Sequence, residues 1–420
     1  MAGETEATRS DTPTPGRFDA LQNPTYRWLW WGGIFVFLAS QAQQVARGWL
    51  AYELTGNNKG LGGVIFGFGV SSLIAVPASG VVADRFSKRK ILAFAQSAMA
   101  VAALGIAIAV ATDTVQYWML IVASVVQGSG MSFLGPARLA MTADLVDRKL
   151  LTNAIFLSNA SIQATRVIGP VVAGVLIAIE PVGIAGVYFI GTALAALSVA
   201  TVARLPKTRP RARSGRSAFG DLADGVRYVR RNPQISRLLV IGVLVVMIGF
   251  PHVTLLPGLV EDDFELDAWA FGALTASAAV GAVSASLFLA NVENRRLGAF
   301  QFRAGAIFAV SLAVFAAIPA YWPAAAVMVI VGGASSAFQA MNNSQVLSIA
   351  DVEYHGRVQS LLMLAFTGFG LAALPVGFLA DAYGIREVMV VLGALVGVAV
   401  ISGESWRSRQ ARDAPEVVSL

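Results

Sequence analysis

The sequence predicts an all-α membrane protein, with twelve transmembrane helices in two six-helix halves around a central cavity. Hydrophobic residues make up 56% of the 420 residues and charged residues only 13%, against roughly 25% charged in a soluble domain. Apolar runs of about 20 residues, the length that crosses a bilayer, recur along the chain. Positive charges gather between alternate runs. This composition excludes a soluble or disordered chain, and the absence of cysteine excludes a disulfide scaffold.

Each apolar run is expected to be a helix, because none shows the two-residue alternation of a membrane barrel strand. The runs are rich in Gly, Ala and Ser, small residues that permit close helix contact in lipid, and Gly63 and Gly67 form one such pair. The expected spans are residues 27–53, 60–82, 90–112, 116–143, 152–179, 183–203, 235–259, 268–290, 301–319, 322–350, 357–380 and 385–403.

One basic stretch, residues 204–234, divides the spans six and six and is expected to be a cytoplasmic linker. Its second half, from about Ala218 to Arg231, could form an amphipathic helix on the membrane surface. The other expected parts are an N-terminal tail (1–26), the N-terminal half (27–203), the C-terminal half (235–403) and a C-terminal tail (404–420).

The two halves look like a duplicated unit. Ile168-Gly169-Pro170-Val171 in the fifth span matches Ala373-Leu374-Pro375-Val376 in the eleventh, at an offset of 205 residues. The segments 83–89 and 290–296 match at an offset of 207. Duplication in a membrane protein is typical of transporters that bind their substrate between the halves, near the midplane.

The charges indicate an orientation with both termini in the cytoplasm. In that orientation 26 of the 31 Lys and Arg residues lie on the cytoplasmic side, whereas only Lys59 and Arg386 lie outside. The acidic segment 261–267 also falls outside. The net charge of +6 therefore follows membrane orientation and does not indicate nucleic-acid binding.

The segment Gly80-Val-Val-Ala-Asp84-Arg85-Phe-Ser87-Lys88-Arg89-Lys90 resembles the loop G-x-x-x-D-R-x-G-R-K of the major facilitator superfamily, with Ser87 replacing Gly and Lys88 replacing Arg. Such a loop can pair with helix ends of the other half in one conformation only. The alternative is plain positive-inside charge. The resemblance implies a conformational latch formed by Gly80, Asp84, Arg85, Lys88, Arg89 and Asp144.

The fifth span carries Gly169-Pro170-Val171-Val172-Ala173-Gly174, which resembles the G-P-x-x-G-G motif of superfamily exporters. Proline removes a backbone hydrogen bond and the small residues allow tight packing, so Gly169, Pro170 and Gly174 are expected to form a kinked, close-packed segment. An ordinary membrane-helix kink is the alternative.

Wider patterns resemble the subgroup of the enterobactin exporter and the macrolide-efflux proteins. They are Asn23-Pro24-Thr25-Tyr26-Arg27, Gly135-Pro136-Ala137-Arg138, and the stretch from Asn153-Ala154 to Arg166-Val-Ile-Gly-Pro. The fourth span departs from the antiporter pattern R-x-x-Q-G, because Ser124 stands where Arg is expected before Gln127-Gly128. That puts the family's usual proton-coupling arrangement in doubt.

Three arginines lie inside expected spans, where an ionised side chain costs at least ~2.5–3.5 kcal/mol at the bilayer centre. No Asp or Glu falls mid-span, so the cations must meet carbonyls, polar side chains, water or ligand. If they face the cavity, they favour anionic or electron-rich substrates; otherwise they tie helices together. The candidate cavity residues are Gln41, Gln44, Arg47, Gln127, Arg138, Arg166, His252, Gln339, Asn342 and Asn343.

Coupling to protons needs a titratable group in the pathway, and the chain offers few. His252, which follows Pro251, titrates near neutrality, and Glu53 lies at the outer end of the first span. Asp84 is a third candidate. A polar helix-contact histidine is the alternative for His252.

The resemblance implies a secondary transporter that exports amphiphilic small molecules, of drug or siderophore type, across the bacterial inner membrane. An importer or a lysophospholipid flippase on the same fold is the alternative. Protons are the expected coupling ion. The protein is expected to be surrounded by membrane lipid and to work as a monomer. An enzyme is not expected, because the chain has two His, no Cys and no P-loop pattern, and no cofactor, metal or nucleic acid is expected either.

Overall fold

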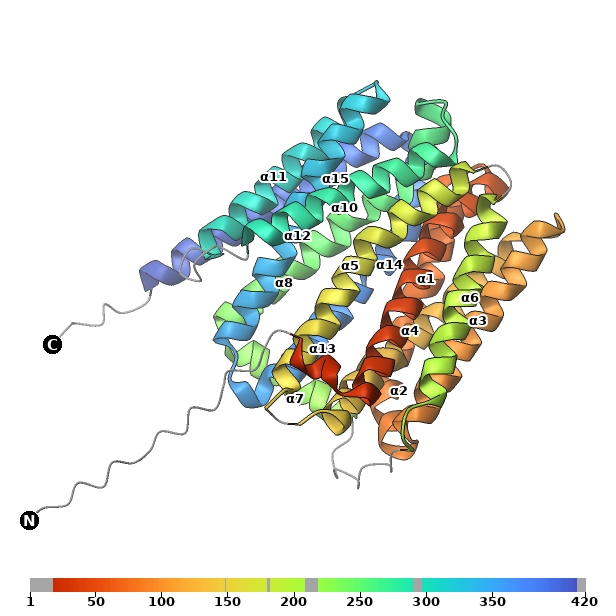
Figure 1. Ribbon diagram of the computed structural model, residues 1–420. Helices are drawn as coiled ribbons and strands as arrows, with labels where there is room; N and C mark the ends of the chain where they lie inside the picture. The colour runs from red at the N-terminus through yellow and green to blue at the C-terminus, as the bar shows by residue number, and fades with distance from the viewer. Residues whose placement is uncertain (1–17, 148, 180–181, 208–217, 290–296, 414–420) are drawn as a thin grey trace, which may run out of the picture.

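The computed structural model describes residues 18–147, 149–179, 182–207, 218–289 and 297–413, and Figure 1 shows how they are arranged. All regular secondary structure in these ranges is helical. The helices form two bundles joined through the linker region, which confirms the predicted all-α fold of two helical halves.

The first bundle begins with a short turn of helix and a capped long helix. The Asn23 side chain accepts hydrogen bonds from the backbone N–H groups of Thr25 and Tyr26, which are otherwise unpaired at a helix start. Gly56, at a φ of 60°, ends that helix. The elements are η1 (Asp19–Gln22), α1 (Pro24–Thr55), α2 (Asn58–Arg85), α3 (Lys88–Ala111), α4 (Tyr117–Leu145), α5 (Leu151–Ala178) and α6 (Gly183–Ala203).

The second bundle departs from the expected spans in two places. The expected helix 235–259 is one regular α-helix only to Gly249 and continues in short 3₁₀, α and π segments, since Pro251 and Pro257 lack the amide hydrogen that a continuous α-helix needs. The expected helix 357–380 divides at Gly368 and not at Pro375. The elements are α8 (Pro233–Gly249), η2 (Phe250–Leu255), α9 (Leu256–Gly258), η3 (Leu259–Asp263), α10 (Ala268–Leu289), α11 (Leu297–Ala317), α12 (Tyr321–Ile349), η5 (Val352–Tyr354), α13 (His355–Thr367), α14 (Phe369–Tyr383) and α15 (Ile385–Asp413).

Within the described residues, 10 helical stretches are long and apolar enough to cross a bilayer by themselves. The more polar α1 and the divided pair α13–α14 supply the other two crossings. Small residues bring these helices together as expected: a Cβ added at Gly63 of α2 would lie 2.3 Å from the Tyr117 hydroxyl of α4. In the second bundle, a Cβ at Gly281 of α10 would lie 1.8 Å from the carbonyl oxygen of Val329 on α12.

The linker forms the predicted amphipathic helix, α7 (Ala218–Arg231). It lies against the ends of α8 and α13. The Tyr228 ring stacks on Tyr354 with centroids 4.0 Å apart, and Val229 is buried against Ile235 and Val358. The second bundle therefore holds α7 through its apolar face.

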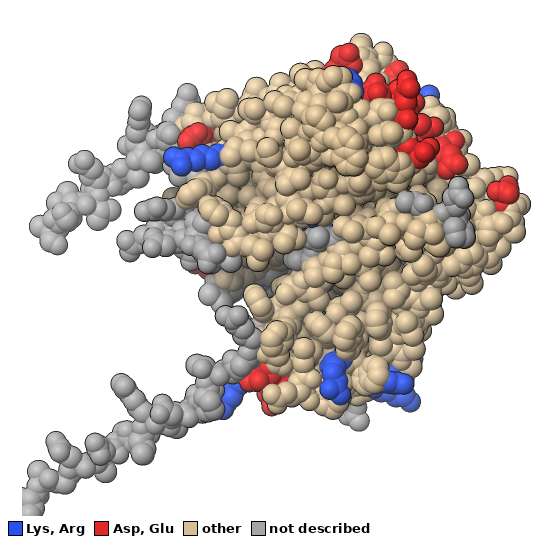
Figure 2. Space-filling model, turned by 45° about the horizontal axis from the view of Figure 1, so that its top comes forward, with Lys and Arg blue, Asp and Glu red and all other residues tan. Residues whose placement is uncertain are grey.

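The bundle has two chemically distinct ends. In Figure 2 most of the visible Asp and Glu gather at one end, and most of the visible Lys and Arg lie toward the other. We name them the acidic end and the basic end. The two halves meet at the acidic end and diverge toward the basic end (Figure 1).

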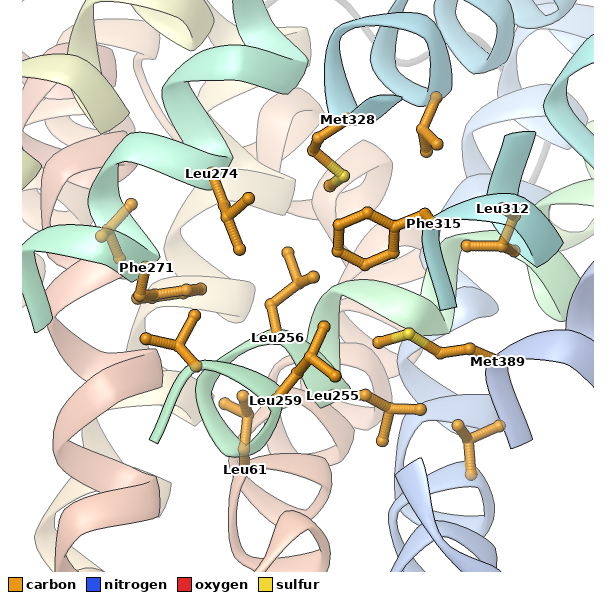
Figure 3. Packing of buried hydrophobic residues seen from close by; sticks show 14 of the residues in the cluster. Leu61, Leu255, Leu256, Leu259, Phe271, Leu274, Leu312, Phe315, Met328 and Met389 are labelled. Atoms are coloured by element: carbon orange, nitrogen blue, oxygen red, sulfur yellow. The ribbon is translucent and has the colours of Figure 1, made fainter. Parts of the chain in front are cut away.

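Apolar packing joins the halves near the acidic end. Figure 3 shows Leu61 of α2 beside Leu255 and Leu259, which belong to the irregular continuation of α8. Phe271 of α10 stacks on Trp49 of α1 with ring centroids 6.3 Å apart. All of these residues except Trp49 are less than 4% exposed, so the contact excludes water at this level.

Candidate functional site

The cavity between the halves is closed at the acidic end by polar contacts as well as apolar ones. The Asp381 carboxylate at the end of α14 accepts hydrogen bonds from the backbone N–H groups of Asn58, at 2.8 Å, and Lys59, at 3.1 Å. These groups begin α2, whose N-terminus carries partial positive charge. The Tyr52 hydroxyl donates to the Asp262 carboxylate in a second contact between the halves.

Glycine contacts also close the two seams between the halves, one near the acidic end and the other nearer the middle of the helices. A Cβ at Gly174 of α5 would lie 2.8 Å from the Cα of Gly272 on α10, and Gly69 of α2 meets Gly370 of α14 in the same way at 2.9 Å. The motif around Gly169 and Pro170 thus contains one seam glycine. Gly169 itself packs on Gln41 of α1, and α5 is helical through Pro170.

Arg47 lies in the interface between α1 and α4. The side chain is 5% exposed, and it donates to the Ser124 hydroxyl, at 2.8 Å, and to the Gln127 side-chain oxygen. Gln127 in turn donates to the Ser40 hydroxyl. The guanidinium therefore contacts position 124, where the family pattern has arginine, although it comes from α1. The sequence pointed to Arg47, Ser124 and Gln127, but not to their contact or to Ser40.

Arg138 also lies in a helix interface. It is 9% exposed and donates to the Leu29 carbonyl of α1 at 3.0 Å. Its guanidinium is 5.9 Å from the centroid of the Phe37 ring and fits against Gly33, where a Cβ would come within 1.9 Å. Arg138 was expected to line the cavity. In this structure it instead ties α4 to α1, because Gly33 leaves room for the guanidinium between the helices.

Arg166 differs from the other two arginines because its side chain is exposed. It makes no hydrogen bond or ion pair with the part of the chain that the structure describes. Val175, nine positions further along α5, is 58% exposed. Nine positions are about two and a half helical turns, so Arg166 lies on the opposite face of α5 from Val175, between the faces that contact α1 at Gly169 and α10 at Gly174.

Two polar side chains of α1 accompany Arg166 in the first bundle. Gln44 is exposed, and Gln41 is half-buried where it packs on Gly169 of α5. The Gln163 side chain, expected on the same face of α5, lies outside the described residues. This side of the cavity therefore combines one cation with neutral amides.

The second bundle contributes a small hollow of about 20 Å³ between α8, α12 and α13. Its lining is apolar except for three amide side chains, all of which the sequence had singled out. The lining residues are Leu239, Gly242, Val243, Val246, Phe338, Gln339, Asn342, Asn343 and Leu362.

A chain of amides fixes one of these side chains. Gln301 of α11 donates to the Asn342 side-chain oxygen at 2.8 Å and accepts from Gln345 at 2.6 Å. Asn342 is 3% exposed, and its amide nitrogen lies against Gly242. Sequence analysis missed Gln301 and Gln345. A lone glutamine in the apolar span of α11 was the available signal for Gln301.

The two candidate proton-coupling residues, His252 and Glu53, lie in different environments. His252 is 5% exposed, its Nδ1 lies 2.6 Å from the Gly249 carbonyl oxygen, and its ring packs edge-on to Phe308. Glu53 is exposed at the acidic end of α1. The structure therefore does not bring these two residues together.

The latch residues lie at the basic end. Lys88, at the start of α3, forms an ion pair with Asp144 near the end of α4, and Arg89 donates to the Ala203 carbonyl at 2.7 Å. These contacts join helices of the same half. Arg85 is exposed, and the side chain of Asp84 and position Gly80 lie outside what the structure describes, so a latch between the halves stays a prediction.

Comparison with known proteins agrees with this architecture. Macrolide efflux protein A of Streptococcus pyogenes is 25% identical over 380 residues, which cover 88% of this chain and 92% of that protein. The staphyloferrin A transporter of Staphylococcus aureus is 23% identical over 366 residues, 85% of this chain and 90% of that one.

Solved structures share the fold at low identity. An inward-facing, occupied bacterial homolog of the human lysosomal transporter Spinster gives a TM-score of 0.74 at 14% identity, covering 93% of this chain and 98% of that one. The nucleoside transporter NupG gives 0.67 at 14% identity, covering 91% and 99%. Each of these is a multi-helix transporter of the major facilitator fold, as expected here.

The profile of one family, described as transmembrane secretion effector, matches residues 15–417, nearly the whole chain. A match of that extent, on a fold of two helical halves around a cavity, covers all the elements described above. The chain belongs to the transmembrane secretion effector family of major facilitator transporters, which are multi-pass membrane proteins that move small molecules and are not enzymes.

Proposed function

We propose that this transporter exports amphiphilic small molecules that carry an anionic or electron-rich group. One observation supports this most directly: Arg166 is an exposed cation on the cavity face of α5, without a counter-charge among the described residues. An unpaired cation in a low-dielectric cavity attracts negative charge strongly. Arg47 and Arg138 are occupied by neutral partners, so Arg166 is the arginine free to meet a substrate.

The other end of the substrate would bind the hollow of the second bundle. Val243 offers partly exposed apolar surface there, and Gln339 and Asn343 offer amide donors and acceptors. The mixed apolar and amide lining suits one part of a substrate that has an apolar body, a few polar groups and one negative or electron-rich site.

The direction of transport and the location rest on the relatives and on charge. The similar proteins are named as a macrolide efflux protein, a siderophore transporter and, over half of the chain, an enterobactin exporter. Those names support the proposed export from the cytoplasm through the bacterial inner membrane, which we expect a monomer containing both halves to perform. The positive-inside rule puts the basic end and both termini in the cytoplasm, and the cavity opens toward that end.

Protons are the proposed driving ion. The protein would transport by alternating access, changing between the present form and a form open at the acidic end. Glu53 is exposed at the acidic end, where external protons reach it first. His252 would have to leave its contact with Gly249 to take up a second proton.

The test uses everted membrane vesicles from an efflux-deficient bacterial host. Anionic, neutral and permanently cationic amphiphilic dyes are offered with and without a proton uncoupler. Accumulation of the anionic dye should require the proton gradient, fall strongly in Arg166→Gln and recover in part in Arg166→Lys. Arg303→Gln, an exposed arginine on α11, is the matched control and should keep wild-type transport.

Two results would contradict the proposal. Transport of permanent cations alone would remove the role of Arg166. Loss of dye from everted vesicles, with uptake into right-side-out ones, would indicate import, the alternative direction on this fold.

A further inference from the structure

We propose that the first bundle holds a small inorganic anion, of the size of chloride, between the Arg47 guanidinium of α1 and the Tyr188 hydroxyl of α6. Both helices belong to one half of the protein. The site therefore goes beyond the proposed function, and it is independent of the substrate and of the direction of transport.

Arg47 carries a buried charge that its contacts do not neutralise. The side chain is 5% exposed, and both of its hydrogen-bond partners, Ser124 and Gln127, are neutral. The Nε atom is buried and has no hydrogen-bond partner among the described residues. No Asp or Glu lies in the middle of any apolar span. A buried charge without a partner is costly, and a bound counter-ion removes much of that cost.

The Tyr188 hydroxyl is a second buried donor without a partner. Tyr188 is 1% exposed, and its oxygen makes no hydrogen bond with the part of the chain that the structure describes. The preceding residue, Val187, is also 1% exposed and apolar, so the surroundings are dry. A buried tyrosine hydroxyl normally donates a hydrogen bond, so an acceptor is expected beside this one.

The register of α1 and α6 brings the two donors to the same level. These helices pack along each other and, as the first and sixth crossings, run in opposite directions. A Cβ at Gly191 of α6 would lie 2.4 Å from the Gln43 side-chain nitrogen of α1. Arg47 is one turn beyond Gln43, and Tyr188 is almost one turn before Gly191, so both lie toward the acidic end of that contact. The two side chains are close enough to interact electrostatically.

Two donors without an acceptor favour an anion over water. The Arg47 Nε–H and the Tyr188 O–H can both donate to one chloride ion, which also compensates the guanidinium charge. A water molecule could accept the same two hydrogen bonds, but it would leave the charge uncompensated and bring two hydrogens that need acceptors of their own. Because both side chains are almost completely buried, the position suits a small ion and not the charged group of an amphiphilic substrate.

The experiment measures thermal unfolding of the detergent-purified protein in sodium chloride and in sodium gluconate, whose anion is too large for the site, at one ionic strength. Chloride should raise the wild-type melting temperature by several degrees with a saturating concentration dependence, because it binds the folded state. Bromide should act like chloride. In Tyr188→Phe most of this rise should be lost. In gluconate that variant should be at least as stable as wild type, because it lacks a buried unpaired hydroxyl.

Tyr321→Phe is the matched control. Tyr321, 7% exposed on α12, already donates to the Ala270 carbonyl at 2.9 Å. Its substitution should lower the melting temperature equally in both salts and keep the chloride-dependent rise. An equal rise in Tyr188→Phe and wild type would overturn the anion site. A Tyr188→Phe variant that is less stable than wild type by the same amount in both salts would also overturn it, since the hydroxyl would then be bonded within the protein.

Bromide also reports the position of the ion. In crystals grown in sodium bromide, the anomalous signal should give a peak within hydrogen-bonding distance of both Arg47 Nε and the Tyr188 oxygen. The absence of a peak there would overturn the site. A peak beside Arg166, with loss of the chloride response in Arg166→Gln, would place the anion in the cavity and overturn a buried site as well. None of these measurements uses transport, so failure of the proposed export would leave their outcome unchanged.

Discussion

The guanidinium of Arg47 on α1 donates a 2.8 Å hydrogen bond to the Ser124 hydroxyl on α4. In the pattern R-x-x-Q-G, position 124 itself carries the arginine, followed by glutamine at 127. Here serine leaves space at 124 and the cation reaches it from the neighbouring helix, next to the retained Gln127. The departure from the family pattern is thus a relocation of charge and not its loss.

If the arginine has moved from position 124 to position 47, the residues at these two positions should be exchangeable. Arg47→Ser removes the cation and leaves Gln127 and Ser124 without their donor, which costs about 1–3 kcal/mol for a buried polar group. Ser124→Arg puts two guanidinium groups in one interface. Both single variants should lower the melting temperature and transport, whereas the double variant Arg47→Ser/Ser124→Arg should recover part of each.

A thermal-shift series on detergent-purified protein, with dye transport in parallel, measures this exchange. Ser124→Ala controls for loss of the hydroxyl alone and should have the smallest effect. If the double variant is no more stable and transports no faster than the worse single variant, positions 47 and 124 do not form one shared site.

The Asp381 contact with the start of α2 predicts a second outcome. Asp381→Asn replaces an anion that accepts from three N–H groups, those of Asn58, its side chain and Lys59, with an amide that brings donors of its own. Hydrogen bonds to charged groups contribute about 1.5–3 kcal/mol. The variant should therefore shift the population toward the form open at the acidic end by about tenfold or more.

Spin labels at Leu54 and Tyr383, both exposed near the acidic end, would report that shift as a longer component in the distance distribution. Asp113→Asn is the matched control: an exposed carboxylate in the turn between α3 and α4, at a φ of 54° that asparagine also accepts. Equal distributions in Asp381→Asn and Asp113→Asn would show that the contact does not hold the seal.

Sequence reasoning reached the fold because hydrophobic length and charge position are properties of the chain alone. It found nearly every helix, including α7. Pro251 marked a place where the seventh span could break, but the sequence did not specify the 3₁₀ geometry that begins at Phe250, since prolines in membrane helices are often tolerated without a break.

The site was less accessible to such reasoning. Arg47, Arg138 and Arg166 look alike in sequence, each a cation in an apolar run. They differ only in what the neighbouring helices supply: Ser124 for Arg47, Gly33 and the Leu29 carbonyl for Arg138, and open cavity for Arg166. Those partners are about 80 to 110 positions away in the chain, so three-dimensional packing alone identifies them.

The ion pair of Lys88 and Asp144 gives a third prediction. Lys88 is 7% exposed, whereas the Asp144 side chain is 39% exposed, so the cation depends on its partner more than the reverse. Asp144→Asn should lower the melting temperature by leaving a buried ammonium unpaired, and Lys88→Met should restore stability in the double variant.

Transport measurements on variants of this ion pair distinguish a packing role from a role in the latch. If Asp144 only neutralises Lys88, the stable double variant Lys88→Met/Asp144→Asn should transport like wild type. If both belong to a latch with Asp84, transport should stay low although the protein is stable, as in Asp84→Asn. The expected result is low transport with normal amounts of protein in the membrane.

The environment of His252 gives a fourth prediction. The imidazole is buried, held at 2.6 Å to the Gly249 carbonyl and packed on Phe308, which are contacts of a structural side chain. His252→Ala should lower stability through the cavity that it leaves, and the pH dependence of efflux should keep its wild-type midpoint. Glu53→Gln is the comparison variant and should shift that midpoint, because its carboxylate is exposed at the acidic end. A shifted midpoint in His252→Ala would make the histidine the coupling group.

The docking of α7 gives the last prediction. The Tyr228 hydroxyl donates to the Asp351 carboxylate at 3.1 Å and accepts from the Asp351 backbone N–H at 3.0 Å. Desolvation raises the pKa of the Tyr228 phenol, so the group is neutral and able to donate throughout the physiological range. Its stabilisation is full below the ordinary tyrosine pKa of about 10 and is lost as pH rises through the higher folded value.

Tyr228→Phe keeps the stacked ring and removes both hydrogen bonds, each contributing about 0.5–1.5 kcal/mol. Trypsin should therefore cut faster after the exposed Arg227, Arg230 and Arg231, because their peptide bonds enter the protease more readily when α7 leaves the bundle and unfolds, and wild type should approach the variant at strongly alkaline pH. Tyr354→Phe preserves the ring stacked 4.0 Å away and should leave the cleavage rate unchanged. Because α7 packs on both α13 and α2, a loosened α7 should also alter transport, and an unchanged cleavage rate in Tyr228→Phe would mean that apolar packing around Val229 alone holds the helix.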